Sequence, residues 1–124
     1  MKKKILVVDD EESLLKMMLH RLNKSGYEAF GAADGEEALD LARQRTPDLI
    51  VLDVFLPKMN GDEVAKILKR DSLLASVPIL LISAAVETLE ERTRSSGADG
   101  YLFKPFETQE FLGMIKEHLA AWGE

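Results

Sequence analysis

Leu49-Ile50-Val51-Leu52-Asp53 is the stretch that decides the fold of this chain. Four apolar residues end directly on a carboxylate, and helix-period patterns flank the run on both sides, which is typical of a buried parallel strand. Two further apolar runs have the same form, one ending at Asp9-Asp10 and the other at Ser83. Because open α/β sheets bind their ligands beyond the carboxyl ends of the strands, we expect all these polar residues at one edge of a sheet.

Strand-like and helix-like patterns alternate along the whole chain. Strands are expected over residues 5–8, 27–32, 49–53, 79–82 and 101–103. Helices are expected over Glu11–Ser25, from the N-cap Asp34 with its capping-box glutamate to the residue before Thr46-Pro47, after Gly61 through Val64, Ile67 and Leu68, over Glu87–Ser96 and over Glu107–Trp122. This alternation predicts a parallel sheet with right-handed crossovers.

The composition of the strands predicts their order. The runs at 5–8, 49–53 and 79–82 are continuously apolar and should be central, whereas 27–32 is mixed and 101–103 is short, as edge strands are. We therefore predict an α/β fold with a doubly wound five-stranded parallel sheet in the order 2-1-3-4-5 and helices on both faces, of the flavodoxin-like type. In this order Asp9, Asp10 and Asp53 face one crevice, where the winding reverses.

The fourth helix, Glu87–Ser96, has few large apolar residues, with little beyond Val86 and Leu89. It is expected to be the least anchored element and the easiest to shift. The methionines and Trp122 are interpreted as packing residues, and His20 and His118 as surface residues.

Composition excludes several classes of protein. At 124 residues and 46% apolar content, the chain fits one globular domain over residues 1–124. No apolar run approaches the roughly 18 residues of a membrane span, and the run after Met1-Lys2-Lys3-Lys4 is too short for a signal peptide, so we expect no membrane insertion and a cytoplasmic location. The absence of cysteine excludes disulfides and thiolate metal sites. A net charge of −6 argues against direct binding to nucleic acid.

The three carboxylates at the predicted crevice indicate a metal site. Carboxylates within a few ångströms of one another repel, which raises the pKa of at least one of them unless a cation lies among them. Oxygen ligands favour Mg²⁺ or Mn²⁺. Taken alone, Asp9 and Asp10 would more often be helix caps, but Asp53 on the adjacent strand favours the metal site.

A set of residues at strand ends carries a resemblance to a known family. In chain order it comprises Asp9-Asp10, Asp53, Pro57, Gly61, Ser83-Ala84, and Tyr101 followed by Lys104-Pro105-Phe106. From Lys3 to about Leu119 the chain resembles the receiver domain of a two-component response regulator, similar to the stand-alone chemotaxis and sporulation regulators. Each residue alone is weak evidence, but the ordered set is specific.

The resemblance implies the chemistry of the site. In this family the residue at Asp53 attacks the phosphorus of a phosphohistidine and becomes an aspartyl phosphate. The metal ligands would be Asp10, Asp53 and the backbone carbonyl of Phe55, with Asp9 helping, often through water. Lys104 would supply a second positive charge, although a lone lysine is usually a solvated surface charge.

The resemblance also assigns switch residues. Ser83 would hydrogen-bond the phosphoryl group, and Tyr101 would turn inward when that hydroxyl moves, although without the motif they are a strand-end turn residue and an edge-strand aromatic. The Lys104–Pro105 peptide is expected to be cis. Phe55 and Ala85 would flank the path of water to the phosphate, and neither has a polar side-chain atom to orient that water, so the aspartyl phosphate is expected to be long-lived.

These expectations describe a phosphoacceptor domain that catalyses its own phosphorylation and slow autodephosphorylation without being a conventional enzyme. A histidine kinase or phosphotransfer protein would donate the phosphoryl group. A conformational change would then pass the signal to a protein target through the face formed by residues 87–96, 101–103 and 107–122. Whether the chain also forms a weak homodimer stays open.

Three alternatives belong to other classes. A hydrolase of the haloacid dehalogenase type needs a second aspartate two residues after the nucleophile, where this chain has Phe55. A flavodoxin-like electron carrier would need a phosphate loop where Asp9-Asp10-Glu11-Glu12 repels phosphate. A degenerate receiver, acting as a binding module independent of phosphorylation, remains as the alternative, although every acidic, hydroxyl and lysine position is filled.

Overall fold

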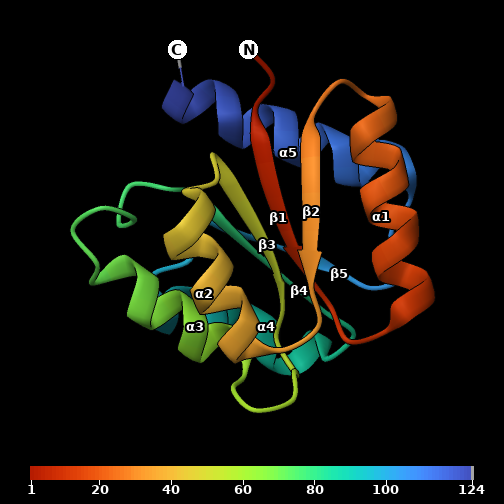
Figure 1. The fold of residues 1–124 in the computed structure, drawn as a ribbon. Helices are drawn as coiled ribbons and strands as arrows, with labels where there is room; N and C mark the ends of the chain where they lie inside the picture. The colour runs from red at the N-terminus through yellow and green to blue at the C-terminus, as the bar shows by residue number, and fades with distance from the viewer. Residues whose placement is uncertain (124) are drawn as a thin grey trace.

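The computed structural model describes the backbone of residues 1–123 and the side chains of residues 1–120 (Figure 1). The elements in chain order are β1 (Lys4–Val8), α1 (Glu12–Lys24), β2 (Glu28–Ala32), α2 (Gly35–Arg45), β3 (Leu49–Asp53), α3 (Gly61–Lys69), β4 (Ile79–Ser83), α4 (Val86–Ser96), β5 (Gly100–Phe103) and α5 (Thr108–Gly123). Each predicted strand and helix is present, and the bounds agree with the prediction to within one residue.

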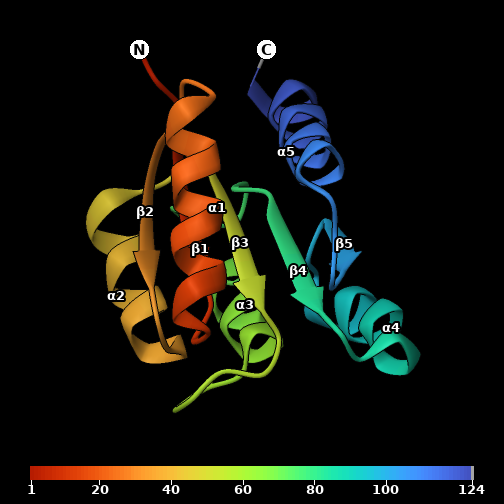
Figure 2. The same ribbon diagram turned by 90° about the vertical axis from the view of Figure 1, so that its right-hand side faces the viewer.

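The strands form one parallel sheet in the order β2-β1-β3-β4-β5, as predicted. The register pairs Val8 with Leu52, and Asp53 with Ile82, so β1, β3 and β4 end at the same edge. Helices α1 and α5 cover one face of the sheet, and α2, α3 and α4 cover the other (Figures 1 and 2). The carboxyl ends of the central strands therefore open at one edge between the two helical layers.

The hydrophobic core has one layer on each face because successive strand residues point to opposite sides. Ile50 and Leu52 pack beneath α2, α3 and α4, whereas Leu49 and Val51 pack beneath α1 and α5. All four are fully buried, and each contributes roughly 1.5–3 kcal/mol to folding. The edge above the core can then carry charge without unfolding the domain.

Helix α2 begins and ends by local chemistry. The Asp34 side chain accepts the Glu37 N–H at 2.8 Å, which lowers the pKa of the Asp34 carboxyl. The Glu37 carboxylate accepts the N–H of Ala33 at 3.0 Å, one residue before the N-cap. The reciprocal bond of the predicted capping box is thus displaced by one residue. The helix ends at Thr46, in the left-handed region at φ 40°, directly before Pro47.

Helix α4 is anchored differently from the prediction. Leu89 is fully buried as expected, but Val86 is 56% exposed. The other buried residues are polar: Thr93 and Ser96, whose hydroxyls donate to the carbonyls of Leu89 and Thr93. Small hydroxyl residues pack closely while their hydrogen-bonding groups are satisfied within the helix, so α4 buries more surface than its apolar residues suggest.

The aromatic and histidine predictions have mixed outcomes. His20 is exposed as predicted, but His118 is partly buried, and its ring lies against Gly100, where a Cβ atom would come within 2.9 Å of Nε2. The interpretation of His118 as a surface residue was therefore wrong. The side chain of Trp122 lies outside the described residues.

No helix in the part of the chain that the structure describes is long and apolar enough to cross a membrane.

Candidate functional site

The sheet brings three predicted carboxylates together. Asp9 and Asp10 follow β1, and Asp53 ends β3, its neighbour in the sheet. One oxygen of each lies within 4.8 Å of the others. Asp9 is fully buried, Asp53 is 7% exposed and Asp10 is exposed. The crevice predicted at the point where the winding reverses is therefore lined by these three side chains.

Lys104, which follows β5, places its ammonium among the carboxylates. Its Nζ lies 3.0 Å from Oδ2 of Asp53 and 3.0 Å from Oδ2 of Asp9, with Oε1 of Glu11 at 3.9 Å. The lysine side chain is only 16% exposed. Lys104 is therefore part of the site, and its interpretation as a solvated surface charge is excluded. Glu11 was not predicted to lie near it.

Burial and charge perturb the ionisation of this cluster. Burial first, and then the negative charge of Asp9, raise the pKa of Asp53 to about 6 against the lowering influence of Lys104. Burial alone would lower the pKa of Lys104, but its close ion pair with Asp9 and its hydrogen bond and ion pair with Asp53 outweigh burial and raise that pKa. Near neutral pH the lysine is charged and Asp53 is mostly ionised.

The candidate metal ligands, the carboxylate oxygens of Asp9, Asp10 and Asp53, suit a hard divalent cation. All three are carboxylate oxygens, the ligands that Mg²⁺ and Mn²⁺ prefer. Oδ1 of Asp9 accepts the Glu11 N–H at 2.9 Å, whereas Oδ2 is buried and makes no hydrogen bond among the described residues. Its distance of 3.0 Å from Lys104 Nζ is that of an ion pair without hydrogen-bond geometry. A buried carboxylate oxygen with remaining capacity is what a cation site requires.

Ser83 lies at the end of β4, beside the carboxylates. Ser83 is buried, and its Oγ accepts the Ala85 N–H at 3.0 Å. This hydrogen bond is the one expected if Ser83 is simply a turn residue at the end of a strand. The hydroxyl hydrogen is not used in that bond, so the same group can donate to a further acceptor. The Ser83 carbonyl accepts the Lys104 N–H at 2.9 Å, which ties the lysine loop to β4.

The other predicted residues lie around this centre. Tyr101 is partly buried on the edge strand and meets Phe103 edge to face at 5.5 Å. Ala85 is the N-cap residue of α4. Phe55 is 48% exposed in the loop after β3. The Lys104–Pro105 bond is cis, as predicted.

The loop after β3 is fixed by a close approach of backbones. The Gly61 N–H donates to the carbonyl of Val54 at 2.7 Å, and a Cβ atom on Gly61 would lie 2.1 Å from the carbonyl oxygen of Asp53. Only glycine permits α3 to start this close to the end of β3. Gly61 therefore helps to hold the segment that carries Asp53.

Sequence reasoning missed Arg92 and Asp62. Arg92 of α4 pairs with Asp62 of α3 at 2.8 Å, and its guanidinium carbon lies 4.8 Å from the centre of the Phe55 ring. These residues are 30 positions apart and belong to separate exposed helical patterns, so no local signal in the sequence pairs them.

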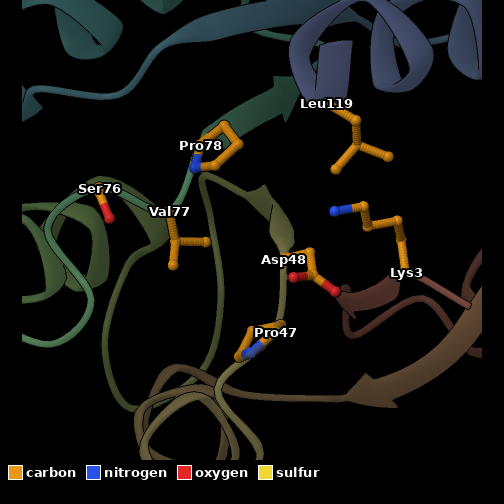
Figure 3. A pocket seen from close by; sticks show the side chains of 7 residues that line it. All are labelled: Lys3, Pro47, Asp48, Ser76, Val77, Pro78 and Leu119. Atoms are coloured by element: carbon orange, nitrogen blue, oxygen red, sulfur yellow. The ribbon is translucent and has the colours of Figure 1, made fainter. Parts of the chain in front are cut away.

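Among the described residues, two of the hollows lie outside the acidic crevice. One of about 330 Å³ opens at the opposite edge of the sheet, lined by Lys3, Pro47, Asp48, Ser76, Val77, Pro78 and Leu119 (Figure 3). Its Asp48 carboxylate already accepts the Lys4 N–H at 2.7 Å. The other, of about 510 Å³, is mostly apolar and lies between α1 and the loop after β5, lined by Glu11, Leu14, Met17, Ala84, Lys104, Pro105 and Phe106. This second hollow reaches the site through Lys104.

Comparison with known families agrees with the fold and the site. Residues 5–116 match the response regulator receiver domain, and the chain belongs to that family of two-component signalling proteins. It is 47% identical over 117 residues to the alkaline phosphatase synthesis transcriptional regulatory protein PhoP of Bacillus subtilis, covering 94% of this chain but 48% of PhoP. It is 40% identical over 120 residues to the polar-differentiation response regulator DivK of Brucella anthropi, covering 96% of this chain and 98% of DivK. The chain thus spans about half of one relative and nearly all of the other.

Solved structures show the same fold. The chemotaxis response regulator CheY4 of Vibrio cholerae superimposes with a TM-score of 0.90 at 35% identity, covering 96% of this chain and all of CheY4 (100%). The receiver domain of the sensor histidine kinase PA1611 of Pseudomonas aeruginosa superimposes with a TM-score of 0.88 at 25% identity, covering 97% of this chain and 99% of that domain. That structure has a magnesium ion coordinated in its active site cleft.

Proposed function

We propose that this domain takes a phosphoryl group from a histidine kinase or phosphotransfer protein onto Asp53 and relays the signal to a protein partner. The observation that carries the proposal is the ion pair of Asp53 and Lys104 at 3.0 Å, with buried Asp9 beside it. An oxygen of the Asp53 carboxylate attacks phosphorus, a P–O bond forms, the P–N bond of the donor phosphohistidine breaks, and the histidine takes a proton from solvent.

The residues around Asp53 have distinct tasks. Lys104 places its positive charge where the phosphoryl oxygens arrive, and the Ser83 hydroxyl donates a hydrogen bond to one of them. Asp9, Asp10, Asp53 and the Phe55 carbonyl would hold Mg²⁺ or Mn²⁺. When bound, the ion neutralises charge on the transferred group.

Two surfaces are proposed for partners. The apolar hollow between α1 and the loop after β5 adjoins Lys104, which suits it to receive the phosphodonor. The face of α4, β5 and α5 is proposed for the downstream target. It presents Val86, 56% exposed, and Phe103, 38% exposed.

Labelling tests the proposed function. Incubated with a small phosphodonor and Mg²⁺, the wild type should gain a phosphoryl group that hydroxylamine removes, as expected for an acyl phosphate, and EDTA should prevent the gain. Asp53→Asn should gain none, whereas Asp40→Asn, an exposed carboxylate on α2, should be labelled like the wild type. Equal labelling of Asp53→Asn would exclude Asp53 as the acceptor. An unlabelled wild type that takes up no BeF₃⁻ would instead favour the degenerate receiver.

A further inference from the structure

Tight backbone contacts hold the residues on both sides of Asn60, in the loop between β3 and α3. A Cβ atom on Gly61 would come within 2.1 Å of the carbonyl oxygen of Asp53. On the other side, a Cβ atom on Gly35, the first residue of α2, would come within 2.2 Å of the carbonyl oxygen of Met59. The loop is therefore fixed both before and after Asn60, and neither contact leaves room for an additional backbone atom.

Asn60–Gly61 is also a chemically reactive pair, because glycine has no side chain to shield its backbone nitrogen. The chain has two asparagines, and the other, Asn23, is followed by lysine within α1. In an asparagine–glycine pair the glycine nitrogen can attack Cγ of the asparagine. A new C–N bond forms, the side-chain amide leaves as ammonia, and the proton lost by the attacking nitrogen passes through solvent to that ammonia. Water then opens the cyclic imide at either carbonyl and gives aspartate or isoaspartate.

The folded chain keeps this pair out of the geometry of attack. The Gly61 N–H donates to the carbonyl of Val54 at 2.7 Å, so the nitrogen keeps its proton and its position. Ring closure requires that nitrogen to rotate until it eclipses Cβ of Asn60, whereas the Asn60 ψ of 153° is extended. The Asn60 N–H donates to Oε1 of Glu63 at 3.2 Å, which holds the residue at the start of α3. The reaction therefore requires the loop to open first.

We propose that Asn60–Gly61 is a deamidation site that the fold protects and that reacts only when the loop between β3 and α3 opens. The aspartate product can refold, because aspartate is as good an N-cap as asparagine. In the isoaspartate product the backbone runs through Cβ and is one atom longer. That atom falls between two fixed contacts, that of Met59 with Gly35 and that of Gly61 with the end of β3. A chain with isoaspartate here can no longer hold Asp53 in its place, whether or not Asp53 is phosphorylated.

The first test compares folded and unfolded chains. Wild-type protein is incubated in mildly alkaline buffer with and without guanidinium chloride, and peptide mass spectrometry follows the conversion of amide to acid at Asn60. Folded chains should react at least roughly ten-fold more slowly than unfolded chains, because only opened molecules contribute. Asn23 should stay unmodified in both samples. Equal rates at Asn60 in the two samples would overturn the protection by the fold, and no reaction in guanidinium chloride would overturn the site itself.

The second test separates opening of the loop from general loss of stability. Gly35→Ala pushes against the backbone of Met59 and should accelerate the reaction at Asn60 several-fold in the folded protein. Gly113→Ala, on α5, is the control and should leave the rate unchanged, because a Cβ atom there would meet nothing within 4 Å. Where Gly35→Ala does not fold, Glu63→Ala takes its place, because it removes the acceptor of the Asn60 N–H. Equal rates in the loop variant and in Gly113→Ala would overturn the role of the loop.

The third test determines which product refolds. Chains aged in guanidinium chloride are returned to buffer, and size-exclusion chromatography separates folded from unfolded molecules. Isoaspartate at position 60 should be depleted from the folded molecules, whereas aspartate should be present in both fractions. Asn60→Ser keeps a good N-cap residue but cannot deamidate, so the same ageing should leave its yield of folded protein unchanged. Isoaspartate that is equally common in the folded fraction would overturn the proposal.

Discussion

Replacing Asp53 with asparagine should stabilise the metal-free protein, although it should also abolish the proposed phosphorylation. The carboxylate is 7% exposed and lies in a cluster that includes the fully buried Asp9. Burial and the charge of Asp9 raise the pKa of Asp53 to about 6, so the folded state disfavours the charged form. Asparagine has nearly the same shape and removes that charge.

The magnitude follows from the pKa. The value of about 6 lies about two units above the usual 3.8, and each unit corresponds to about 1.4 kcal/mol, which gives a ceiling of about 3 kcal/mol. This ceiling already includes the attraction between Asp53 and Lys104, and in the variant Lys104 keeps Asp9 as a partner at 3.0 Å. We expect a net gain of about 1–2 kcal/mol in the free energy of unfolding at pH 7.5.

The direction of the Asp53 pKa shift determines the pH range over which the stability difference appears. A carboxyl whose pKa is raised by folding binds its proton more tightly in the folded state, so wild-type stability falls as pH rises from about 4 to about 6, and the loss is complete above that range. The difference between Asp53→Asn and the wild type should therefore be near zero at pH 4 and reach its full value by pH 7. Carboxylates outside the cluster of Asp9, Asp10 and Asp53 titrate alike in both proteins, so their contributions cancel.

Urea unfolding in EDTA between pH 4 and 7.5 measures this difference. Asp40→Asn controls for removing one negative charge from a chain of net charge −6. Added Mg²⁺ should stabilise the wild type more than Asp53→Asn. A destabilised Asp53→Asn, or a difference that does not change with pH, would refute the reasoning.

Three further predictions concern residues around the site and Lys69, which joins the end of α3 to the loops before β4 and β5. Lys104→Met should lower metal-free stability by about 2–3 kcal/mol in urea unfolding, because it leaves two buried carboxylates without their cation. Lys69→Met should cost about 2–3 kcal/mol in the same assay, because Nζ donates to the carbonyls of residues 75 and 77 and lies 2.8 Å from Asp99. Phe55→Asn combined with Ala85→Glu should accelerate Mg²⁺-dependent dephosphorylation several-fold without changing the amount of folded protein, because the polar groups orient the attacking water.

Each of these has a control or a contradicting outcome. Lys66→Met, on an exposed position of α3, should change stability by less than about 0.5 kcal/mol. A Lys104→Met protein as stable as the wild type in EDTA would show that the ammonium does not balance the buried carboxylates. If the Phe55 and Ala85 double variant loses phosphate no faster than the wild type, the two positions do not control water.

The fold was predictable because burial leaves a strong pattern. Continuous apolar runs placed β1, β3 and β4 at the centre, and the mixed and short strands proved to be the edges. Helix α4 was the weak point. Its burial depends on Thr93 and Ser96, whose hydroxyls donate to their own helix, and composition does not distinguish such hydroxyls from solvated ones.

The site was predictable only where strand ends fix it. Asp9, Asp10 and Asp53 follow from strand order, since neighbouring parallel strands end at one edge. The place of Lys104 among them came from the resemblance, because nothing local distinguishes it from a surface lysine. The contact of Arg92 with Asp62, 30 positions earlier, depends on how α3 and α4 are rotated about their axes and on the rotamers of both side chains. Hydrophobic periodicity determines neither.

The charge balance of the site explains how a local reaction can reach α4. Three carboxylates and one ammonium leave two formal negative charges, which a divalent cation balances. In the proposed reaction the phosphoryl group adds about one more negative charge beside Ser83. The Ser83 hydroxyl is close enough to donate a hydrogen bond to one of the phosphoryl oxygens. Movement of Oγ toward that charge would release the Ala85 N–H, which belongs to the N-cap of α4. One hydrogen bond is worth about 0.5–1.5 kcal/mol, so its loss would loosen the first turn of α4, while buried Leu89 and the Arg92–Asp62 ion pair continue to hold the rest of the helix.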